Sequence, residues 1–162
     1  MPDRLRYRRL TAGDLADVHR LHSDPETNRH NPYGADADLG VTRDRLAGWL
    51  QHWDDNGFGY ELIDDDSGCI GICGFRRDLW LGLDVLNLYW RLDPSVWGRG
   101  YALEAGRHSL DGARASAGEE LVVARMTDDN AASQHIAEKL GMLPRPDLTA
   151  EADGARWVVY AD

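Results

Sequence analysis

The sequence predicts a single α/β domain built on a mixed β-sheet. Short segments with strand patterning alternate with longer segments whose apolar residues recur at the spacing of a helix. The chain has 162 residues, a length typical of one domain with its own core. Apolar residues make up 43% and charged residues 28% of the chain, as in ordinary globular proteins. We therefore expect one domain over residues 1–162.

The N-terminal half predicts one strand and two helices. Alternation over residues 5–10 indicates a first strand, and Thr11 then precedes a helical pattern with Asp14 in its first turn. Prolines and glycines over residues 23–39 predict a loop. A second helix is expected from Thr42, with an apolar stripe that ends at Gly57.

The rest of the chain alternates strands and helices. Two patterned segments flank a turn of Asp, Ser and Gly residues, which predicts a hairpin. The expected strands are residues 59–64, 69–75, 85–92, 121–126 and 155–160, and the expected helices are residues 101–115 and 131–140. With the N-terminal elements this gives strand, two helices, three strands, helix, strand, helix and strand.

Charge and composition exclude several classes of function. The net charge of −10 argues against nucleic acid binding and suits a cationic partner, such as an amine or a basic peptide. No apolar run is long enough to cross a bilayer and no signal-like start is present, so we expect a cytoplasmic protein without membrane partners. Cys69 and Cys73 are expected on one face of a strand, too far apart for a disulfide, and no metal site is expected.

One loop carries the chemistry that the sequence indicates. The segment Trp97-Gly98-Arg99-Gly100-Tyr101-Ala102 lies between a predicted strand and the start of a long predicted helix. The first N–H groups of a helix are unpaired and lie at the positive end of its dipole, so they bind anions. The two glycines allow a phosphate to approach the main chain, and the arginine adds charge. On these residues alone, an anion site and an ordinary glycine-rich turn both remain open.

Two motifs resemble those of the GNAT superfamily of N-acetyltransferases. Trp97-x-x-Gly100-x-Ala102 resembles the loop that binds the pyrophosphate of coenzyme A (CoA) in that family. The segments 129–133 and 138–142 resemble a downstream Asn-x-x-Ser…Glu-Lys-x-Gly-Phe pattern, and Gly71–Gly74 resembles the third strand. Trp90-Arg91-Leu92-Asp93-Pro94 is similar to the branch that includes the ribosomal-protein alanine N-acetyltransferases. The order of elements agrees over nearly the whole chain.

The resemblance implies a fold, a co-substrate and an activity. The GNAT fold is a mixed, mostly antiparallel twisted sheet of six to seven strands, flanked by about four helices and splayed between strands 4 and 5. Acetyl-CoA would lie in the splay as co-substrate, and its acetyl group would pass directly to a primary amine on a peptide N-terminus or a small molecule. Pairing of exposed edge strands in related folds raises the expectation of a homodimer. The expected cofactor-binding residues are Trp90, Arg91, Leu92, Trp97, Gly98, Arg99, Gly100, Tyr101, Ala102, Asn130 and Ser133.

The acid–base half of the expected site departs from the family pattern. Ala137 stands where many relatives have a tyrosine acid, so Ser133 is the better candidate for protonating the leaving thiolate. Asn87 stands where relatives often have a glutamate base; an amide cannot take up a proton there but can hold a water molecule. Glu61 is the nearest candidate for a base, with Asp84 behind it. Each side chain has a plain structural alternative: a solvated strand residue for Glu61, and a small residue at a crowded helix contact for Ser133.

The sequence is also compatible with two other functions. The atypical acid–base residues are compatible with a catalytically weak GNAT-fold module that binds acyl-CoA as a sensor. The glycine loop is also compatible with a regulatory domain that binds a nucleotide. Turnover with any amine would exclude the pure sensor, and failure of ATP to compete with CoA would argue against the nucleotide-binding domain.

Overall fold

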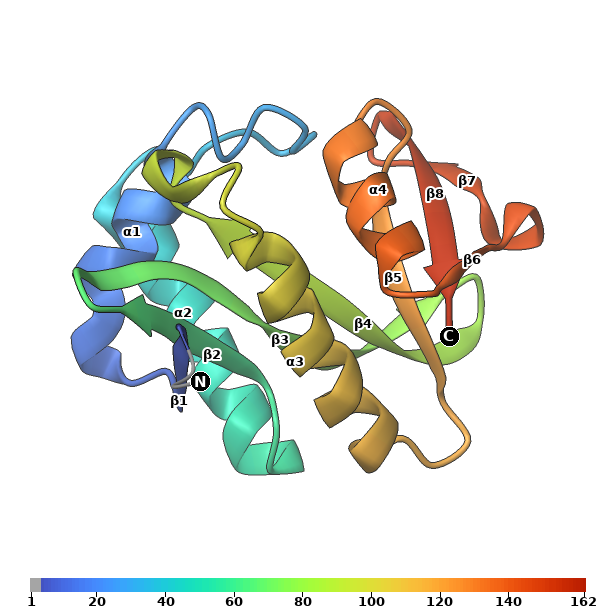
Figure 1. The fold of residues 1–162 in the computed structure, drawn as a ribbon, viewed down its shortest axis with the longest axis horizontal. Coiled ribbons are helices and arrows are strands. Elements are labelled where there is room, and N and C mark those ends of the chain that lie inside the picture. The colour runs from blue at the N-terminus through green and yellow to red at the C-terminus, as the bar shows by residue number, and fades with distance from the viewer. Residues whose placement is uncertain (1–3) are drawn as a thin grey trace.

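A computed structural model describes residues 4–162 of the chain as one sheet covered on both faces by helices (Figure 1). The sheet has eight strands in the order β1-β2-β3-β4-β5-β8-β6, with β7 also paired to β8. The strands are β1 Arg6–Arg9, β2 Tyr60–Asp65, β3 Gly68–Trp80, β4 Leu83–Leu92, β5 Leu121–Thr127, β6 Leu143–Pro144, β7 Ala150–Ala152 and β8 Ala155–Ala161. The α-helices are α1 Leu15–Ser23, α2 Leu39–Asn56, α3 Tyr101–Ser116 and α4 Ala131–Lys139. This confirms the predicted mixed, mostly antiparallel GNAT fold.

Helices α1 and α2 pack on one face of the sheet, and α3 and α4 pack on the other (Figure 1). On the face covered by α1 and α2, Trp49 of α2 packs against Tyr60 and Ile72 of the sheet. On the face covered by α3 and α4, Leu110 of α3 packs against Leu86 and Leu88 of β4. None of the described helices is long and apolar enough to cross a membrane.

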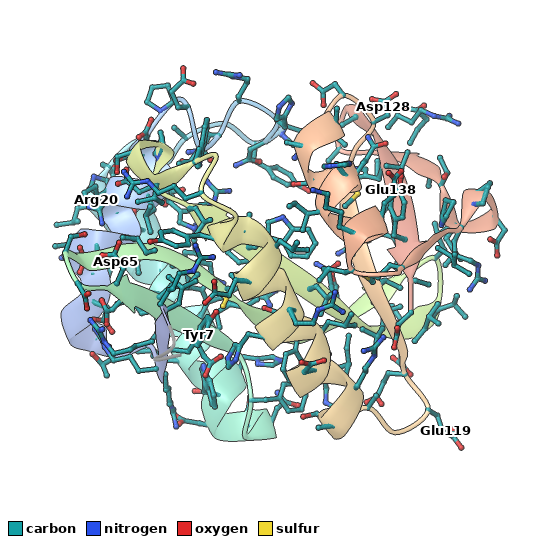
Figure 2. All side chains as sticks on the ribbon, viewed as in Figure 1. Tyr7, Arg20, Asp65, Glu119, Asp128 and Glu138 are labelled. Atoms are coloured by element: carbon teal, nitrogen blue, oxygen red, sulfur yellow. The ribbon has the colours of Figure 1, made fainter. Side chains whose placement is uncertain are left out.

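The pairing between β4 and β5 stops early and leaves the sheet splayed. These parallel neighbours pair only at Val85–Leu121, Leu86–Val122 and Asn87–Val123 in the described chain. Strand β4 then continues to Leu92 and β5 to Thr127. Because the two strands run in the same direction, their carboxyl ends open at one edge of the sheet, where α3 and α4 begin. Figure 2 shows Asp128, just after β5, at that edge, and Glu119, just before β5, at the opposite one.

Several boundaries differ from the sequence prediction for local reasons. Helix α2 begins at Leu39 rather than Thr42, because the Asp38 side chain accepts a hydrogen bond from the Val41 N–H (3.0 Å) and caps the helix. Strands β3 and β4 extend beyond the predicted residues 69–75 and 85–92 to form a long hairpin. Its turn uses the positive φ angles of Leu81 (50°) and Gly82 (81°). The two shortest strands, β6 and β7, were not predicted and bring the sheet to eight strands.

The expectation that Cys69 and Cys73 share a face is wrong. Cys69 packs with the cluster under α1 and α2, whereas Cys73 belongs to the cluster that includes Ala105 of α3. A register shift between β2 and β3, at Ile63 and Asp64, breaks the alternation between the two cysteines. They therefore point to opposite faces, and both are free thiols.

Candidate functional site

The predicted anion loop has a backbone conformation that depends on its two glycines. Asp93 fixes its start by accepting a hydrogen bond from the Ser95 N–H (2.9 Å), and a 3₁₀ turn follows at Pro94–Val96. Gly98 and Gly100 then adopt φ angles of +78° and +80°, a conformation that L side chains rarely adopt. A Cβ atom placed on Gly98 would meet no atom of residues 4–162 within 4 Å, so the described chain leaves the space beside this part of the loop open. Glycine is therefore required for both the conformation and the access.

Main-chain N–H groups are left free at this loop. Among residues 4–162, no protein acceptor takes a hydrogen bond from the N–H groups of residues 98–103. The Glu104 N–H is the first to bond back into the helix, to the Gly100 carbonyl (3.2 Å). Unpaired N–H groups at the positive end of a 16-residue helix are suited to binding an anion.

Arg4 is a further residue at the loop that sequence reasoning missed. Its guanidinium donates to Glu104 Oε2 (2.6 Å) and to the Arg99 carbonyl (3.3 Å). It also lies over the Tyr101 ring, 4.8 Å from the centroid. These contacts tie the chain before β1 to the start of α3. No local pattern could indicate a contact across about a hundred residues.

The open edge of β4 holds the other predicted cofactor residues. Beyond Asn87 this strand pairs with β3 alone, so alternate main-chain groups of residues 88–92 face the splay. The Trp90 side chain packs toward α3, while Arg91 points to the opposite face. Trp97 is 46% exposed, and its indole N–H donates to the Leu92 carbonyl (3.0 Å). The loop is thus tied to the end of the strand that leads into it.

Asn130 and Ser133 lie together at the start of α4. The Asn130 Oδ1 atom accepts a hydrogen bond from the Ser133 N–H (3.1 Å) and caps the helix. Both starting ends, of α3 and of α4, lie at the edge where β4 and β5 end (Figure 1). At the other end of α4, Arg107 donates to the carbonyls of Leu140 and Lys139 (both 3.4 Å). Arg107 is therefore used to cap that helix.

A buried polar network lies on the opposite face of β4, under α1. Arg91 Nε donates to the Tyr89 hydroxyl oxygen (2.7 Å), which lies 2.9 Å from His22 Nε2. Burial, followed by the nearby charges of Arg91 and Arg45, lowers the pKa of His22 to about 2. A neutral ring can accept a proton in a hydrogen bond, so the Tyr89 hydroxyl donates to His22 Nε2. The low pKa makes His22 a weak base.

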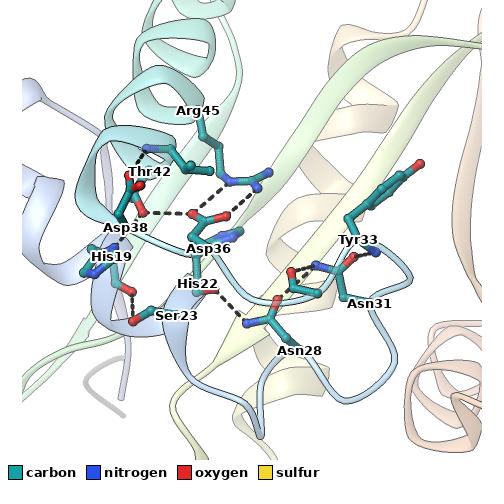
Figure 3. Close-up of polar contacts among 12 residues, drawn as sticks. His19, His22, Ser23, Asn28, Asn31, Tyr33, Asp36, Asp38, Thr42 and Arg45 are labelled. Carbon is teal, nitrogen blue, oxygen red and sulfur yellow. Dashed lines mark hydrogen bonds and ion pairs between the residues drawn. The ribbon is translucent and has the colours of Figure 1, made fainter.

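The loop between α1 and α2 is fixed to this network and reaches across the splay. Figure 3 shows Asn28 donating to the His22 carbonyl (2.8 Å) and Asp36 accepting from Arg45 (2.7 Å) and Thr42 (2.8 Å). Burial alone would raise the pKa of Asp36, but these two hydrogen bonds outweigh it and lower the pKa. The loop stays attached to α2 as a result.

The far side of the loop contacts the other half of the sheet. The Thr127 hydroxyl donates to the His30 carbonyl (3.2 Å), and His30 Nδ1 lies 3.2 Å from Asp129 Oδ2. Tyr33 donates to Asp153 in the turn between β7 and β8. The loop therefore bridges β5 and the α1–α2 pair across the open end of the sheet.

The three predicted catalytic residues do not come together. Asn87 shares a strand face with Tyr89, which packs against Trp49 of α2, and its buried Oδ1 atom has no hydrogen-bond partner among residues 4–162. Glu61 lies on the other face. It accepts a hydrogen bond from His108 Nε2 of α3 (2.6 Å).

The His108 ring in turn stacks on Tyr7, with 3.7 Å between the ring centroids. Figure 2 shows Tyr7 on the side of α3 that faces β1 and β2. Glu61 thus belongs to a cluster under the middle of α3, while Asn87 belongs to the face covered by α1 and α2. Ser133 lies at the start of α4, near the splay.

Comparison with known proteins identifies the family. The acetyltransferase (GNAT) domain family matches residues 4–143, most of the chain. The protein belongs to the GNAT acetyltransferase family. The splay, the glycine loop and the start of α4 all lie within the matched residues.

Solved structures of GNAT proteins share the fold over almost the whole chain. A GNAT-family acetyltransferase from Bordetella pertussis is 22% identical, with a TM-score of 0.81 over 99% of this chain and 96% of that one. Spermidine N-acetyltransferase from Vibrio cholerae, solved with CoA and spermine, is 15% identical, with a TM-score of 0.76 over 98% and 95%. Ribosomal-protein-S5-alanine acetyltransferase from Vibrio fischeri is 16% identical, with a TM-score of 0.73 over 99% and 93%. At these identities the similarity shows the fold alone.

Proposed function

We propose that this GNAT protein is an acetyl-CoA-dependent N-acetyltransferase that transfers the acetyl group directly to a primary amine in a ternary complex. The observation that carries the proposal is the splay between β4 and β5, beside a loop whose N–H groups have no acceptor among the described residues. A thioester with a pyrophosphate at one end fits this combination. The solved spermidine N-acetyltransferase relative contains CoA, which supports the co-substrate.

Each part of the cofactor has residues suited to it. The N–H groups of residues 98–103 would bind the pyrophosphate, with Arg99 adding charge. Main-chain groups of Trp90, Arg91 and Leu92, at the open edge of β4, would bind pantetheine as a strand binds its neighbour. Asn130 and Ser133 would contact the cofactor from α4.

The chemistry needs an oxyanion donor, a route for protons and no covalent enzyme intermediate. The neutral amine attacks the thioester carbon, and a fixed N–H group of β4 stabilises the negative oxygen until the C–S bond breaks. A water molecule held by Asn87 carries the proton away from the nitrogen, and the Ser133 hydroxyl protonates the departing thiolate. We assign no step to Glu61, because it is bonded to His108 on the other face.

The two thiols are unsuited to nucleophilic catalysis. Burial raises the pKa of Cys69 to about 11 and that of Cys73 to about 12. Neither is a thiolate at neutral pH, and thiolates are the reactive form. Direct transfer therefore fits this chain better than an acyl-enzyme.

Calorimetric titration with acetyl-CoA tests the cofactor site. Gly100→Glu places bulk and negative charge beside the free N–H groups, so we expect no measurable binding. Gly82→Glu is the matched control, because Gly82 has nearly the same φ (+81° against +80°) and lies at the tip of the β3–β4 hairpin. We expect the control to bind like the wild type. Unchanged affinity in Gly100→Glu would contradict the pyrophosphate assignment.

Release of free thiol across a panel of amines tests transfer itself. Turnover with at least one primary amine is the expected result. Binding of acetyl-CoA without turnover on any amine would instead support the sensor module, which the amide at Asn87 and the fully buried Ala137 favour. The panel includes ribosomal-protein N-terminal peptides that begin with alanine, because the segment Trp90–Pro94 supports that branch.

A further inference from the structure

Arg76 on β3 is a half-buried arginine that has no carboxylate partner in the part of the chain that the structure describes. Its guanidinium lies over the Tyr60 ring, 5.4 Å from the centroid. Among residues 4–162 it forms no ion pair and no hydrogen bond. The chain has 28 acidic residues for 18 basic ones, and most of its other arginines pair with a carboxylate. A half-buried guanidinium left unpaired in so acidic a protein is suited to binding an anion from outside the chain.

Arg76 shares its space with the position where transfer would take place. Arg76 and Asn87 are directly opposed in the antiparallel β3–β4 ladder. Side chains opposed in this way lie on one face, with their Cβ atoms about 4.5–5.5 Å apart. Both therefore face the side covered by α1 and α2. The buried Oδ1 atom of Asn87 also lacks a partner in the described chain.

The neighbouring side chains give this face a local positive charge. Arg91 contacts Tyr89, Asn28 and Thr27 but no carboxylate of residues 4–162. Arg125 of β5 lies on the same face and stacks over Trp80 at 4.4 Å. Asp78 pairs with Arg125, yet the buried Arg125 Nε atom still has no acceptor in the described chain. Among the described residues of β3, β4 and β5 on this face, three guanidinium groups thus lie beside one carboxylate, that of Asp78.

The positive charge on this face is opposite in sign to the net charge of the whole protein. The net charge of −10 predicts a cationic partner, but a polyamine entering here would meet like charges at close range. His22 does not change the balance, because it is neutral at ordinary pH, and Arg45 is matched by Asp36. An anionic group on the acceptor would be attracted instead.

We propose that the acceptor is an amine that carries a carboxylate a few bonds from the reacting nitrogen, as an α-amino acid does, and that Arg76 binds this carboxylate. The planar fork of arginine matches the two oxygens of a carboxylate, and the Tyr60 ring supports the plane of the fork. With the carboxylate held there, the nitrogen lies toward Asn87 and the open edge of β4. The assignment rests on the N-acetyltransferase function proposed above.

Steady-state kinetics on matched acceptors tests the assignment. The pairs are α-amino acids and their amides, such as phenylalanine and phenylalaninamide, with spermidine as a polyamine. For the wild type we expect kcat/KM to be at least tenfold higher for the acid than for the amide. Arg76→Gln should raise KM for the acid at least tenfold. It should leave kcat for the acid, and both kcat and KM for the amide, unchanged. Arg76→Lys, which keeps the charge but not the fork, should lie between.

Arg43→Gln is the control, since Arg43 is an exposed arginine of α2 without an ion pair in the described chain. It should behave like the wild type, and all variants should bind CoA equally well by calorimetry. An equal effect of Arg76→Gln on acids and amides, or a wild type that prefers spermidine to every acid, would overturn the assignment.

Binding of the product separates this inference from the proposed function. N-acetylphenylalanine is titrated calorimetrically into CoA-saturated wild-type and Arg76→Gln protein, which needs no turnover. Binding to the wild type that is lost in Arg76→Gln supports the carboxylate site, even if no amine is acetylated and the transfer proposal fails. Turnover that is independent of Arg76, with equal product binding in both proteins, would leave the transferase function standing and refute the carboxylate site.

Discussion

His22 makes the stability of the fold depend on pH in a way that can be calculated from its environment. Its side chain is almost fully buried (3% exposed) between α1 and β4, where the Tyr89 hydroxyl donates to its ring. Burial lowers its pKa from 6.5 to about 2. Below pH 6.5 the unfolded chain therefore takes up a proton at this histidine while the native protein does not. Unfolding becomes easier as the pH falls toward 2.

The magnitude follows from the size of the shift. Each pH unit below 6.5 removes about 1.4 kcal/mol, so His22 lowers the free energy of unfolding by about 2 kcal/mol between pH 8 and pH 5. Carboxylates contribute little in this window, because their pKa values lie lower. His52 contributes in the same direction, since burial also lowers its pKa. A variant at His22 is needed to separate its contribution to the free energy of unfolding from that of His52.

Urea denaturation of wild type and His22→Gln at pH 8 and pH 5 measures the contribution of His22 to the pH dependence of unfolding. Glutamine does not titrate but can still accept a hydrogen bond from Tyr89. We expect the loss of stability between the two pH values to be about 2 kcal/mol smaller in His22→Gln than in the wild type. His135→Gln, at an exposed position of α4, should keep the wild-type loss. Equal pH dependence in wild type and His22→Gln would show that His22 is not held neutral.

Substitutions of Asn130, Ser133 and Gly74 test the site and the sheet. Asn130→Ala should lower stability by about 1 kcal/mol through loss of the α4 cap and also weaken CoA binding. Asn130→Ser should keep the cap; weaker CoA binding in this variant, measured by calorimetry, isolates the amide contact, and wild-type binding would contradict it. Ser133→Ala should lower kcat by about 10²-fold with CoA affinity unchanged if its hydroxyl protonates the thiolate, and an unchanged kcat would exclude that role. Gly74→Ala should lower the melting temperature much more than Gly68→Ala, because a Cβ at Gly74 lies 2.5 Å from the Gly59 carbonyl whereas one at Gly68 meets nothing within 4 Å; equal shifts would contradict this packing.

Features that depend on neighbouring residues were predictable from the sequence. The glycine loop, the start of α3 and the Asn130 cap of α4 are local, because residues a few positions apart determine each of them. The long helices and most strands follow in the same way from periodicity. The two motifs, with the order of these elements, predicted the splay by resemblance to a family.

Contacts across the sheet were not predictable in this way. A register shift between β2 and β3 places Cys69 and Cys73 on opposite faces, and no turn residue marks it. The face of Glu61 depends on the register of β2 against β3, so its separation from Asn87 appears only in the folded sheet. The opposition of Arg76 and Asn87 across the β3–β4 ladder, and the lack of an ion pair for Arg76 among the described residues, likewise appear only in the folded sheet.

A crystal structure of the protein with acetyl-CoA tests the central claim most directly. We expect the pyrophosphate within hydrogen-bonding distance of main-chain N–H groups of residues 98–103. Pantetheine should pair with the open edge of β4 between residues 88 and 92, which would place the thioester between Asn87 and Ser133. Acetyl-CoA bound outside the β4–β5 splay, or absent from it at saturating concentration, would contradict the assignment of this site.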